Sequence, residues 1–190
     1  MKLNRYGQAA ILSEHDRKKI RKCFSCKRDK LLFDIACYTG ERWGAILQLR
    51  IDDCYSVRTQ PRDEITFRRE TRKGKQETRQ VPVHPLLKDS LALYKPTGKV
   101  YLFESKTIAR PISFQNANYN LQVAIERAGL KSKGFSTHST RRTFITRLSE
   151  MGVDLRTIQS ITGHRSLATL QRYIEESPER KAKAVEALSL

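Results

Sequence analysis

The sequence of 190 residues lacks any long hydrophobic stretch. No apolar run approaches the roughly 20 residues that a membrane-spanning helix needs, and the N-terminus has no apolar core of a secretory signal. Internal repeats and long linkers are absent as well. These absences exclude a membrane protein and favour one domain over residues 1–190, with residues 1–13 as a short polar lead-in.

Cysteine is scarce, with four residues at Cys23, Cys26, Cys37 and Cys54. The first two have the spacing of zinc ligands, but no second such pair and no paired histidine completes a set of four ligands. We therefore expect no metal ion, no cofactor and reduced thiols, which are usual in cytosolic proteins.

Acidic residues are also few: 20 Asp and Glu face 37 Lys and Arg, which gives a formal net charge of +17. Hydrophobic residues make up 38% of the chain and are spread along it, which indicates a folded body. A charge of this size on a globular domain points first to nucleic acid and then to an anionic membrane surface. We expect a DNA or RNA partner, no membrane, and a cytoplasmic, nucleoid-associated protein.

Apolar periodicity predicts a mainly helical α+β domain with a small three-stranded antiparallel sheet. Residues 55–57, 65–67 and 81–83 alternate as strands, and a strongly basic hairpin lies between the last two at 68–79. The segments expected to be helical are 14–23 behind a Ser13 cap, 30–38, 43–49, 85–94, 114–128, 139–151, 155–162, 167–174 and a tail helix over 177–190.

Caps and breakers mark the helices of the C-terminal third. Asp154 and Ser166 are expected N-caps, and Gly152 and Gly163 are expected ends. A stripe of apolar residues on one helix face should be buried, namely Phe144, Ile145, Leu148 and Met151.

His138 and Arg141 lie three residues apart at an expected helix start, where they share one face. An arginine fork, a histidine and free backbone N–H groups together suit a phosphate. The Ser166 cap leaves His164 in a connecting loop, and Tyr173 borders an apolar stripe. Taken singly, a histidine and an arginine with this spacing more often mark an exposed polar helix start than a binding site. A tyrosine in the position of Tyr173 is more often part of the core or its edge than a nucleophile.

Together, these pieces resemble the tyrosine recombinase (phage integrase) family. The segment Ile161–Tyr173, ITGHRSLATLQRY, resembles the second motif of that family, and HSTRRTF at 138–144 resembles its HxLRRTFAT motif. Thr39-Gly40-Glu41-Arg42 precedes them in the family order. The resemblance covers nearly the whole chain and implies the fold of the recombinase catalytic domain.

The resemblance assigns roles residue by residue. Arg42 and Arg141 would hold the non-bridging oxygens of the scissile phosphate, and Tyr173 would be the nucleophile that forms a 3′-phosphotyrosyl link. His138 and His164 would contact the phosphate, and one of them would help to remove the tyrosine proton.

A lysine on the basic hairpin would protonate the leaving 5′-oxygen. Lys73 is the preferred candidate and Lys75 the alternative, and positive neighbours would lower the pKa of either one.

Three positions depart from the family pattern. Ala45 stands where many members carry a glutamate, so the support that this glutamate gives is missing or replaced. Glu41 stands where a hydrophobic residue is common, and it has basic residues near it to pair with. The second motif begins Ile161-Thr162-Gly163 rather than with the usual leucine and glycine.

Family members usually carry an N-terminal domain that closes a clamp around DNA, which residues 1–13 do not provide. The chain is therefore expected to be a catalytic fragment or a naturally short relative. It would be a monomer when free and a tetrameric synapse on double-stranded DNA. The tail 177–190 would dock on its own domain or on a neighbouring protomer.

The implied function is site-specific DNA recombination by strand transesterification, as in the integrases of mobile elements. Two alternatives are a type IB topoisomerase-like enzyme that nicks and rejoins, and a DNA-binding module without catalysis.

Overall fold

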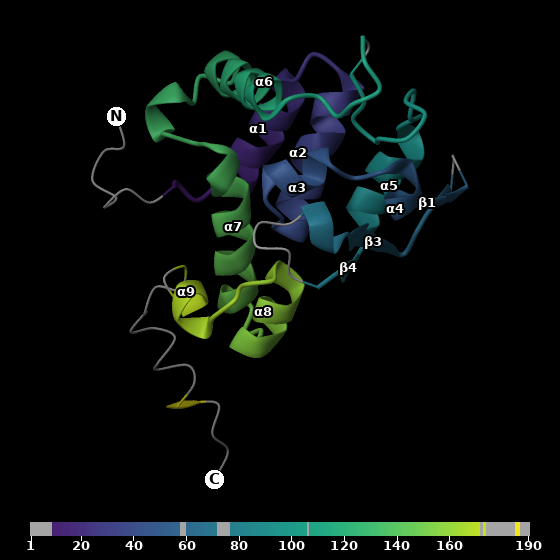
Figure 1. The fold of residues 1–190 in the computed structure, drawn as a ribbon. Coiled ribbons are helices and arrows are strands. Elements are labelled where there is room, and N and C mark those ends of the chain that lie inside the picture. Colours follow the sequence, from purple (N-terminus) through teal and green to yellow (C-terminus); the bar gives the residue numbers. More distant parts are fainter. Residues whose placement is uncertain are drawn as a thin grey trace. The chain divides into compact units, whose positions relative to one another are not determined.

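The computed structural model describes residues 9–57, 60–71, 77–105, 107–171, 173 and 185–186. The chain forms two compact units, residues 1–144 and residues 145–190. Both are built mainly from helices, with small antiparallel sheets in the first (Figure 1). The expected fold class is therefore confirmed.

Unit 1 begins with two helices whose ends follow local sequence signals. Ser13 caps α1 (Glu14–Cys23), and its side chain accepts a hydrogen bond from the Asp16 N–H at 3.1 Å. The next helix, α2 (Lys27–Thr39), ends at Gly40, whose φ of 61° lies in the left-handed region that glycine adopts without a steric penalty. The Ser13 cap agrees with the expectation from sequence, and the helix expected over 30–38 begins three residues earlier, at Lys27, and ends one residue later.

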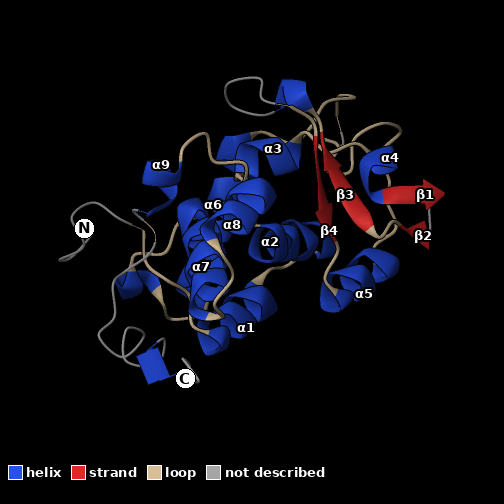
Figure 2. Ribbon diagram, turned by 90° about the horizontal axis from the view of Figure 1, so that it is seen from below, coloured by secondary structure: helices blue, strands red, loops and turns tan. Residues whose placement is uncertain are grey.

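The centre of unit 1 is α2, which contacts α1, α3 (Trp43–Leu47), α5 (Pro85–Leu93) and α6 (Phe114–Arg127) (Figure 2). Its residues from Leu31 to Ala36 are almost fully buried. All of them are apolar except Asp34, which is a buried carboxylate. A short 3-10 turn, η2 (Lys131–Lys133), follows α6. The helices expected over residues 43–49, 85–94 and 114–128 are thus present, each ending within about two residues of the expected position.

The strands pair differently from the expected three-stranded sheet. In the described residues, β1 (Tyr55–Val57) pairs with β2 (Gln60–Pro61), while β3 (Glu64–Phe67) pairs with β4 (Arg79–Pro82), so that two separate two-stranded sheets form. The reason lies in β1, where Tyr55 is buried but Val57 is 56% exposed, so the strand presents little apolar surface to a wider sheet.

Two further short helices escaped prediction from the sequence. A helix, α4 (Ile51–Cys54), precedes β1, and a 3-10 turn, η1 (Arg69–Thr71), begins the segment between β3 and β4. The segment 101–103 lies beside the residues that follow α3: the Leu102 N–H donates to the Leu49 carbonyl at 2.9 Å, and Tyr101 forms an isolated bridge with Arg50.

The helix α7 (Thr137–Glu150) contains the boundary between the units. Unit 2 comprises the end of that helix, α8 (Leu155–Thr162) and α9 (Leu167–Gln171), packed around Ile145, Ile158 and Leu170. The side chains of Asp154 and Ser166 accept the backbone N–H groups of Thr157 and Thr169, as the cap predictions required.

Met151 was wrongly expected in the apolar stripe, since it is 77% exposed. The chain turns at Gly152, whose φ is 81°, and the next residue, Val153, packs against the cluster instead. The tail helix expected over 177–190 lies outside the described residues except for 185–186. No helix in the described ranges is long and apolar enough to cross a membrane.

Candidate active site

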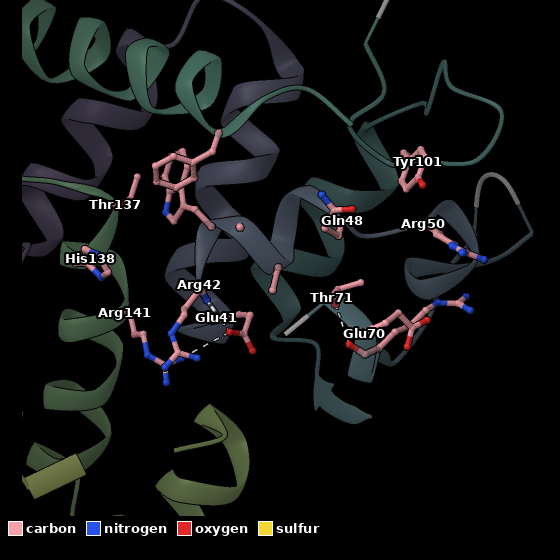
Figure 3. Close-up of a pocket in the computed structure, with 15 residues that line it drawn as sticks. Glu41, Arg42, Gln48, Arg50, Glu70, Thr71, Tyr101, Thr137, His138 and Arg141 are labelled. Atoms are coloured by element: carbon pink, nitrogen blue, oxygen red, sulfur yellow. Dashed lines mark hydrogen bonds and ion pairs between the residues drawn. The ribbon is translucent and has the colours of Figure 1, made fainter. Parts of the chain in front are cut away.

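A cavity of about 580 Å³ in unit 1 gathers three of the residues that the sequence singled out. Arg42, His138 and Arg141 line it together (Figure 3). Its other lining residues are Glu41, Trp43, Gly44, Ala45, Gln48, Arg50, Arg68, Glu70, Thr71, Tyr101, Phe114 and Thr137. The expectation that His138 and Arg141 share one helix face is confirmed, because both point to this cavity from the first two turns of α7.

Arg42 reaches the cavity because the chain turns sharply just before it. Gly40 ends α2 in a left-handed conformation, and Arg42 then serves as the extended N-cap of α3, with its side chain half-buried. A Cβ atom at Gly40 would lie 2.4 Å from the ring of Phe144 on α7. Only glycine therefore lets the end of α2 approach α7 this closely.

That close approach also positions Arg141, whose side chain is 3% exposed. Its Nη1 donates a hydrogen bond to the carbonyl oxygen of Gly40 at 2.8 Å, and it lies 3.8 Å from Oε1 of Glu41. The two arginines approach Glu41 from different elements, Arg42 from the start of α3 and Arg141 from α7 (Figure 3). Positive charge is thus concentrated at one end of the cavity, while exposed His138 lies at the beginning of the same helix.

Glu41 is the buried counter-charge of this arrangement, with 1% of its side chain exposed. Its Oε1 accepts the Arg42 backbone N–H at 2.7 Å, and its carboxylate also forms an ion pair with Arg79 on β4. A buried carboxylate is stable only when it is paired and hydrogen-bonded. The expectation that Glu41 pairs with basic residues is confirmed, and its carboxylate joins α3, α7 and β4.

Arg79 is a residue that sequence reasoning missed, because it was included in the solvated basic hairpin. It is 9% exposed and lies over the ring of Phe67, with its guanidinium carbon 5.5 Å from the ring centroid. The signal was present in the sequence: Arg79 and Val81 are two residues apart and therefore face the same side of a strand. Both are buried in the structure.

Ala45 lies on α3 and lines the cavity, with 5% of its surface exposed. No carboxylate is available there, and the carboxylate near Arg141 comes from Glu41 instead. The sequence left open whether the support of the family glutamate is missing or replaced. The position of Glu41 beside Arg141 supports replacement.

The cavity also has Arg68 in its lining, and this arginine is paired with two carboxylates. The Nε of Arg68 donates to Asp53 at 2.7 Å, and its Nη2 donates to Asp52 at 3.1 Å. Burial alone would lower the pKa of Arg68, but these two carboxylates outweigh it and raise the pKa. Burial also raises the pKa of Asp53 itself. Exposed Arg50 lies on the same wall.

His164 and Tyr173 come together in unit 2, with their ring centroids 5.6 Å apart and the ring planes at 56°. The Tyr173 carbonyl accepts a hydrogen bond from the Thr146 hydroxyl at 3.2 Å, and its N–H donates to the Leu170 carbonyl at 2.9 Å. Nδ1 of His164 lies 2.7 Å from the hydroxyl oxygen of Thr162. As expected, His164 sits in the loop between Gly163 and the Ser166 cap.

The structure thus groups five of the predicted site residues into two sets. Arg42, His138 and Arg141 share the cavity of unit 1, while His164 and Tyr173 adjoin in unit 2. The sixth, Lys73, and its alternative Lys75 lie outside the described residues. Across the described ranges, no group of three or more His, Cys, Asp or Glu side chains is arranged to hold a metal ion.

Comparison with known proteins gives matches along most of the chain. Residues 10–180 match the model of the phage integrase family. The tyrosine recombinase XerD of Corynebacterium glutamicum is 33% identical over 153 residues, which cover 77% of this chain and 47% of that protein. XerD of Mycobacterium leprae is 34% identical over 158 residues, with the same two coverages of 77% and 47%. The chain therefore spans about half the length of these relatives.

Solved structures of recombinases share the fold of this chain. The crystal structure of XerA recombinase has a TM-score of 0.73 at 25% sequence identity, and the match covers 96% of this chain and 67% of that chain. The XerH site-specific recombinase bound to palindromic difH substrate, a post-cleavage complex, has a TM-score of 0.70 at 25% identity, covering 94% of this chain and 53% of that chain.

Proposed function

This chain belongs to the phage integrase family, and from that premise we propose that it is the catalytic domain of a site-specific DNA recombinase. The observation that carries the proposal is the convergence of Arg42 and Arg141 on one cavity, beside His138. Two guanidiniums that line one cavity from separate elements suit a group with two anionic oxygens. A phosphodiester is such a group.

The two arginines would stabilise the transition state of phosphoryl transfer. As a nucleophile attacks phosphorus, negative charge grows on the non-bridging oxygens, and preorganised cations lower the energy of that charge. Arg141 meets the requirement for preorganisation because it is buried and bonded to the Gly40 carbonyl. Removing one such donor from an enzyme typically slows the reaction about 10²- to 10³-fold.

Tyr173 would supply the nucleophile. Its hydroxyl oxygen forms a bond to phosphorus while the bond from phosphorus to the 5′-oxygen breaks, which leaves a 3′-phosphotyrosyl link and a free 5′-hydroxyl. The tyrosine proton passes to a base, for which His138 and His164 are the candidates. A hairpin lysine, Lys73 or the alternative Lys75, gives a proton to the 5′-oxygen. The reverse reaction rejoins strands without an external energy source, because one phosphoester replaces another.

The partner would be double-stranded DNA, which the net charge of +17 favours. Binding by this chain alone should be largely to phosphates, so it should weaken steeply with salt. Exchange of strands between two sites needs several protomers, and we propose a tetrameric synapse on DNA with a monomer in free solution. XerH, to which this chain is similar, was crystallised on its difH substrate.

Covalent trapping tests the proposal. A pool of nicked duplexes with randomised recognition sequence loses the short 5′-hydroxyl fragment after cleavage, so that a protein–DNA adduct accumulates. The adduct should form with the unchanged chain and vanish in Tyr173→Phe. Tyr119→Phe is the matched control, because Tyr119 is 67% exposed on α6 in unit 1. Absence of any adduct across the pool would favour a DNA-binding module without catalysis.

Strand exchange separates the recombinase from a type IB topoisomerase-like enzyme. Two labelled duplexes that carry the trapped sequence should yield recombinant products with the recombinase. Relaxation of supercoiled plasmids of arbitrary sequence, without recombinant products, would favour the topoisomerase-like alternative.

A modified leaving group identifies the acid on the hairpin. Lys73→Ala should slow cleavage of a normal 5′-oxygen leaving group far more than cleavage of a 5′-thiol, which departs without a proton from an acid. Lys75→Ala is the matched variant two residues away. If Lys75→Ala gives this pattern and Lys73→Ala does not, the alternative assignment holds.

A further inference from the structure

Thr162 lies at the C-terminal end of α8 and is fully buried. Its position in the second motif departs from the family pattern, where a leucine is usual and no hydroxyl is present. A buried hydroxyl is retained at little cost only if it is hydrogen-bonded. Two contacts of this hydroxyl within unit 2 determine the chemical state of the neighbouring histidine.

The first partner is the carbonyl oxygen of Ile158, one helical turn earlier, at 2.6 Å from Oγ1 of Thr162. A carbonyl oxygen only accepts hydrogen bonds, so the hydroxyl must be the donor here. A hydroxyl carries a single hydrogen, and this bond uses it.

The second partner is Nδ1 of His164, at 2.7 Å from the same oxygen. Because the hydroxyl hydrogen points to Ile158, the oxygen meets Nδ1 as an acceptor, and Nδ1 must then carry a hydrogen. We propose that Thr162 sets the tautomer of His164, so that Nδ1 keeps its hydrogen and Nε2 of the neutral ring is the proton-accepting nitrogen.

The backbone around His164 maintains this geometry. Gly163 ends α8 in a left-handed conformation with φ of 63°, and its N–H donates to the Gln159 carbonyl at 2.7 Å. The side-chain amide of Gln159 in turn donates to the His164 carbonyl at 3.0 Å. The main chain on both sides of the imidazole is thus tied to α8, the helix that carries Thr162.

The tautomer has a direct chemical consequence, which rests on the proposed function. With Nδ1 occupied, neutral His164 accepts a proton only at Nε2, and this suits it to take the hydroxyl proton of Tyr173 as the tyrosine oxygen bonds to phosphorus. The ring centroids of the two residues are 5.6 Å apart. Once Nε2 holds the proton, it becomes a donor for a phosphate oxygen. Thr162 is therefore a positioning residue that acts through His164.

Nuclear magnetic resonance of ¹⁵N-histidine in the full chain tests the tautomer without any DNA. At a pH where imidazole is neutral, the nitrogen shifts of His164, assigned by their loss in His164→Gln, should report hydrogen on Nδ1. Thr162→Ser keeps the hydroxyl and should keep the tautomer, whereas Thr162→Val should shift the population towards hydrogen on Nε2. Thr157→Val is the matched control, since that hydroxyl on α8 bonds Asp154 instead.

Hydrogen on Nε2 in the unchanged chain, or an unaltered tautomer in Thr162→Val, would overturn the proposal. Thermal unfolding of each variant establishes that the fold is retained, and the spectra decide the tautomer even if no DNA is ever cleaved. Failure of the proposed function and failure of this inference are therefore distinguishable.

Cleavage kinetics test the consequence. Thr162→Val should slow formation of the Tyr173 adduct about 10-fold, which corresponds to the loss of one ordinary hydrogen bond. Thr162→Ser should restore most of the rate. Equal rates in all three proteins, with the tautomer changed, would show that His164 does not serve as the proton acceptor.

Discussion

The arginine-bearing part of unit 1 and the tyrosine-bearing part of unit 2 are held by different means. Arg141 is fixed by a main-chain carbonyl and by Glu41, a buried carboxylate shared with α3 and β4. Tyr173 is held through its main chain, by Thr146 and Leu170, beside a cluster with three fully buried side chains.

The difference is consistent with the roles that we propose for the two groups. Guanidiniums that stabilise a developing charge work best when they are already in place, and holding cations close together inside a protein requires a buried counter-charge. A nucleophile must instead form a new bond and be released again. Among the described residues, Tyr173 is anchored by hydrogen bonds of its main chain and by packing of its ring, which suits the role that we propose for its hydroxyl.

The largest effect is expected from changing a buried arginine in unit 1. Arg141→Lys keeps the charge but loses the planar fork, so adduct formation should slow about 10²- to 10³-fold. Arg127→Lys is the control, since Arg127 is exposed in the last turn of α6. A rate within a few fold of the unchanged chain would mean that charge alone suffices and that preorganisation in unit 1 is unimportant.

The next largest effect is expected from removing the counter-charge. Glu41→Gln leaves Arg79 and Arg141 without their shared carboxylate, and breaking a buried ion pair costs about 3–5 kcal/mol. The free energy of unfolding should fall by an amount of this order in denaturant titrations, and adduct formation should slow as well.

Asp34→Asn provides the control for Glu41→Gln, because Asp34 is another buried carboxylate of unit 1, paired with Arg21 away from the cavity. It should also reduce stability but should leave the cleavage rate of the folded protein unchanged. If both variants slow cleavage equally, Glu41 acts through general stability and not through the arginines.

A smaller change compares the two cores directly. Ile158→Val in unit 2 and Ile46→Val in unit 1 remove the same methylene group from fully buried side chains, each at a cost of about 1 kcal/mol. Amide hydrogen exchange should accelerate mainly in α8 and α9 for the first variant. Uniform acceleration along the chain in that variant would mean that the two units unfold together.

The smallest effect is expected from lowering the pH, which should weaken the N-cap of α8 at Asp154. Hydrogen bonds from the Thr157 hydroxyl and backbone N–H lower the pKa of Asp154 below its ordinary value of 3.8. Because the folded-state pKa is the lower one, the cap stabilises the helix above the ordinary value, and this contribution is lost as the pH falls through the folded-state pKa. Exchange in α8 should accelerate over that range, and Asp154→Asn should remove this dependence.

Much of the fold was readable from the sequence because its signals are local. Ser13, Asp154 and Ser166 cap helices through bonds to residues three positions away, and Gly40 and Gly163 end helices through their own backbone angles. The partners of the strands were not readable, since pairing depends on which face of β1 meets the core. Val57 is exposed, and β1 pairs locally with β2.

The site was predictable where a single motif carries it and less so where distant segments meet. The convergence of Arg42 and Arg141 followed from the family resemblance, and the cavity agrees with it. The burial of Arg79 was missed because a charged residue in a basic run is usually solvated, and its pairing with Glu41 and its contact with Phe67 come from segments distant in the sequence. The bond from Thr162 to His164 depends on side-chain orientation, which no spacing rule reveals.

The absence of a side chain at Gly40 affects which relatives of this chain can keep Arg141 in place. Its missing Cβ lets a carbonyl oxygen reach Arg141 and lets the ring of Phe144 pack at a distance that no other residue allows. A descendant that acquired a side chain there would displace the arginine while every reacting group remained in its sequence. If the proposed function holds, a relative with any other residue at position 40 should be inactive even when its tyrosine is retained.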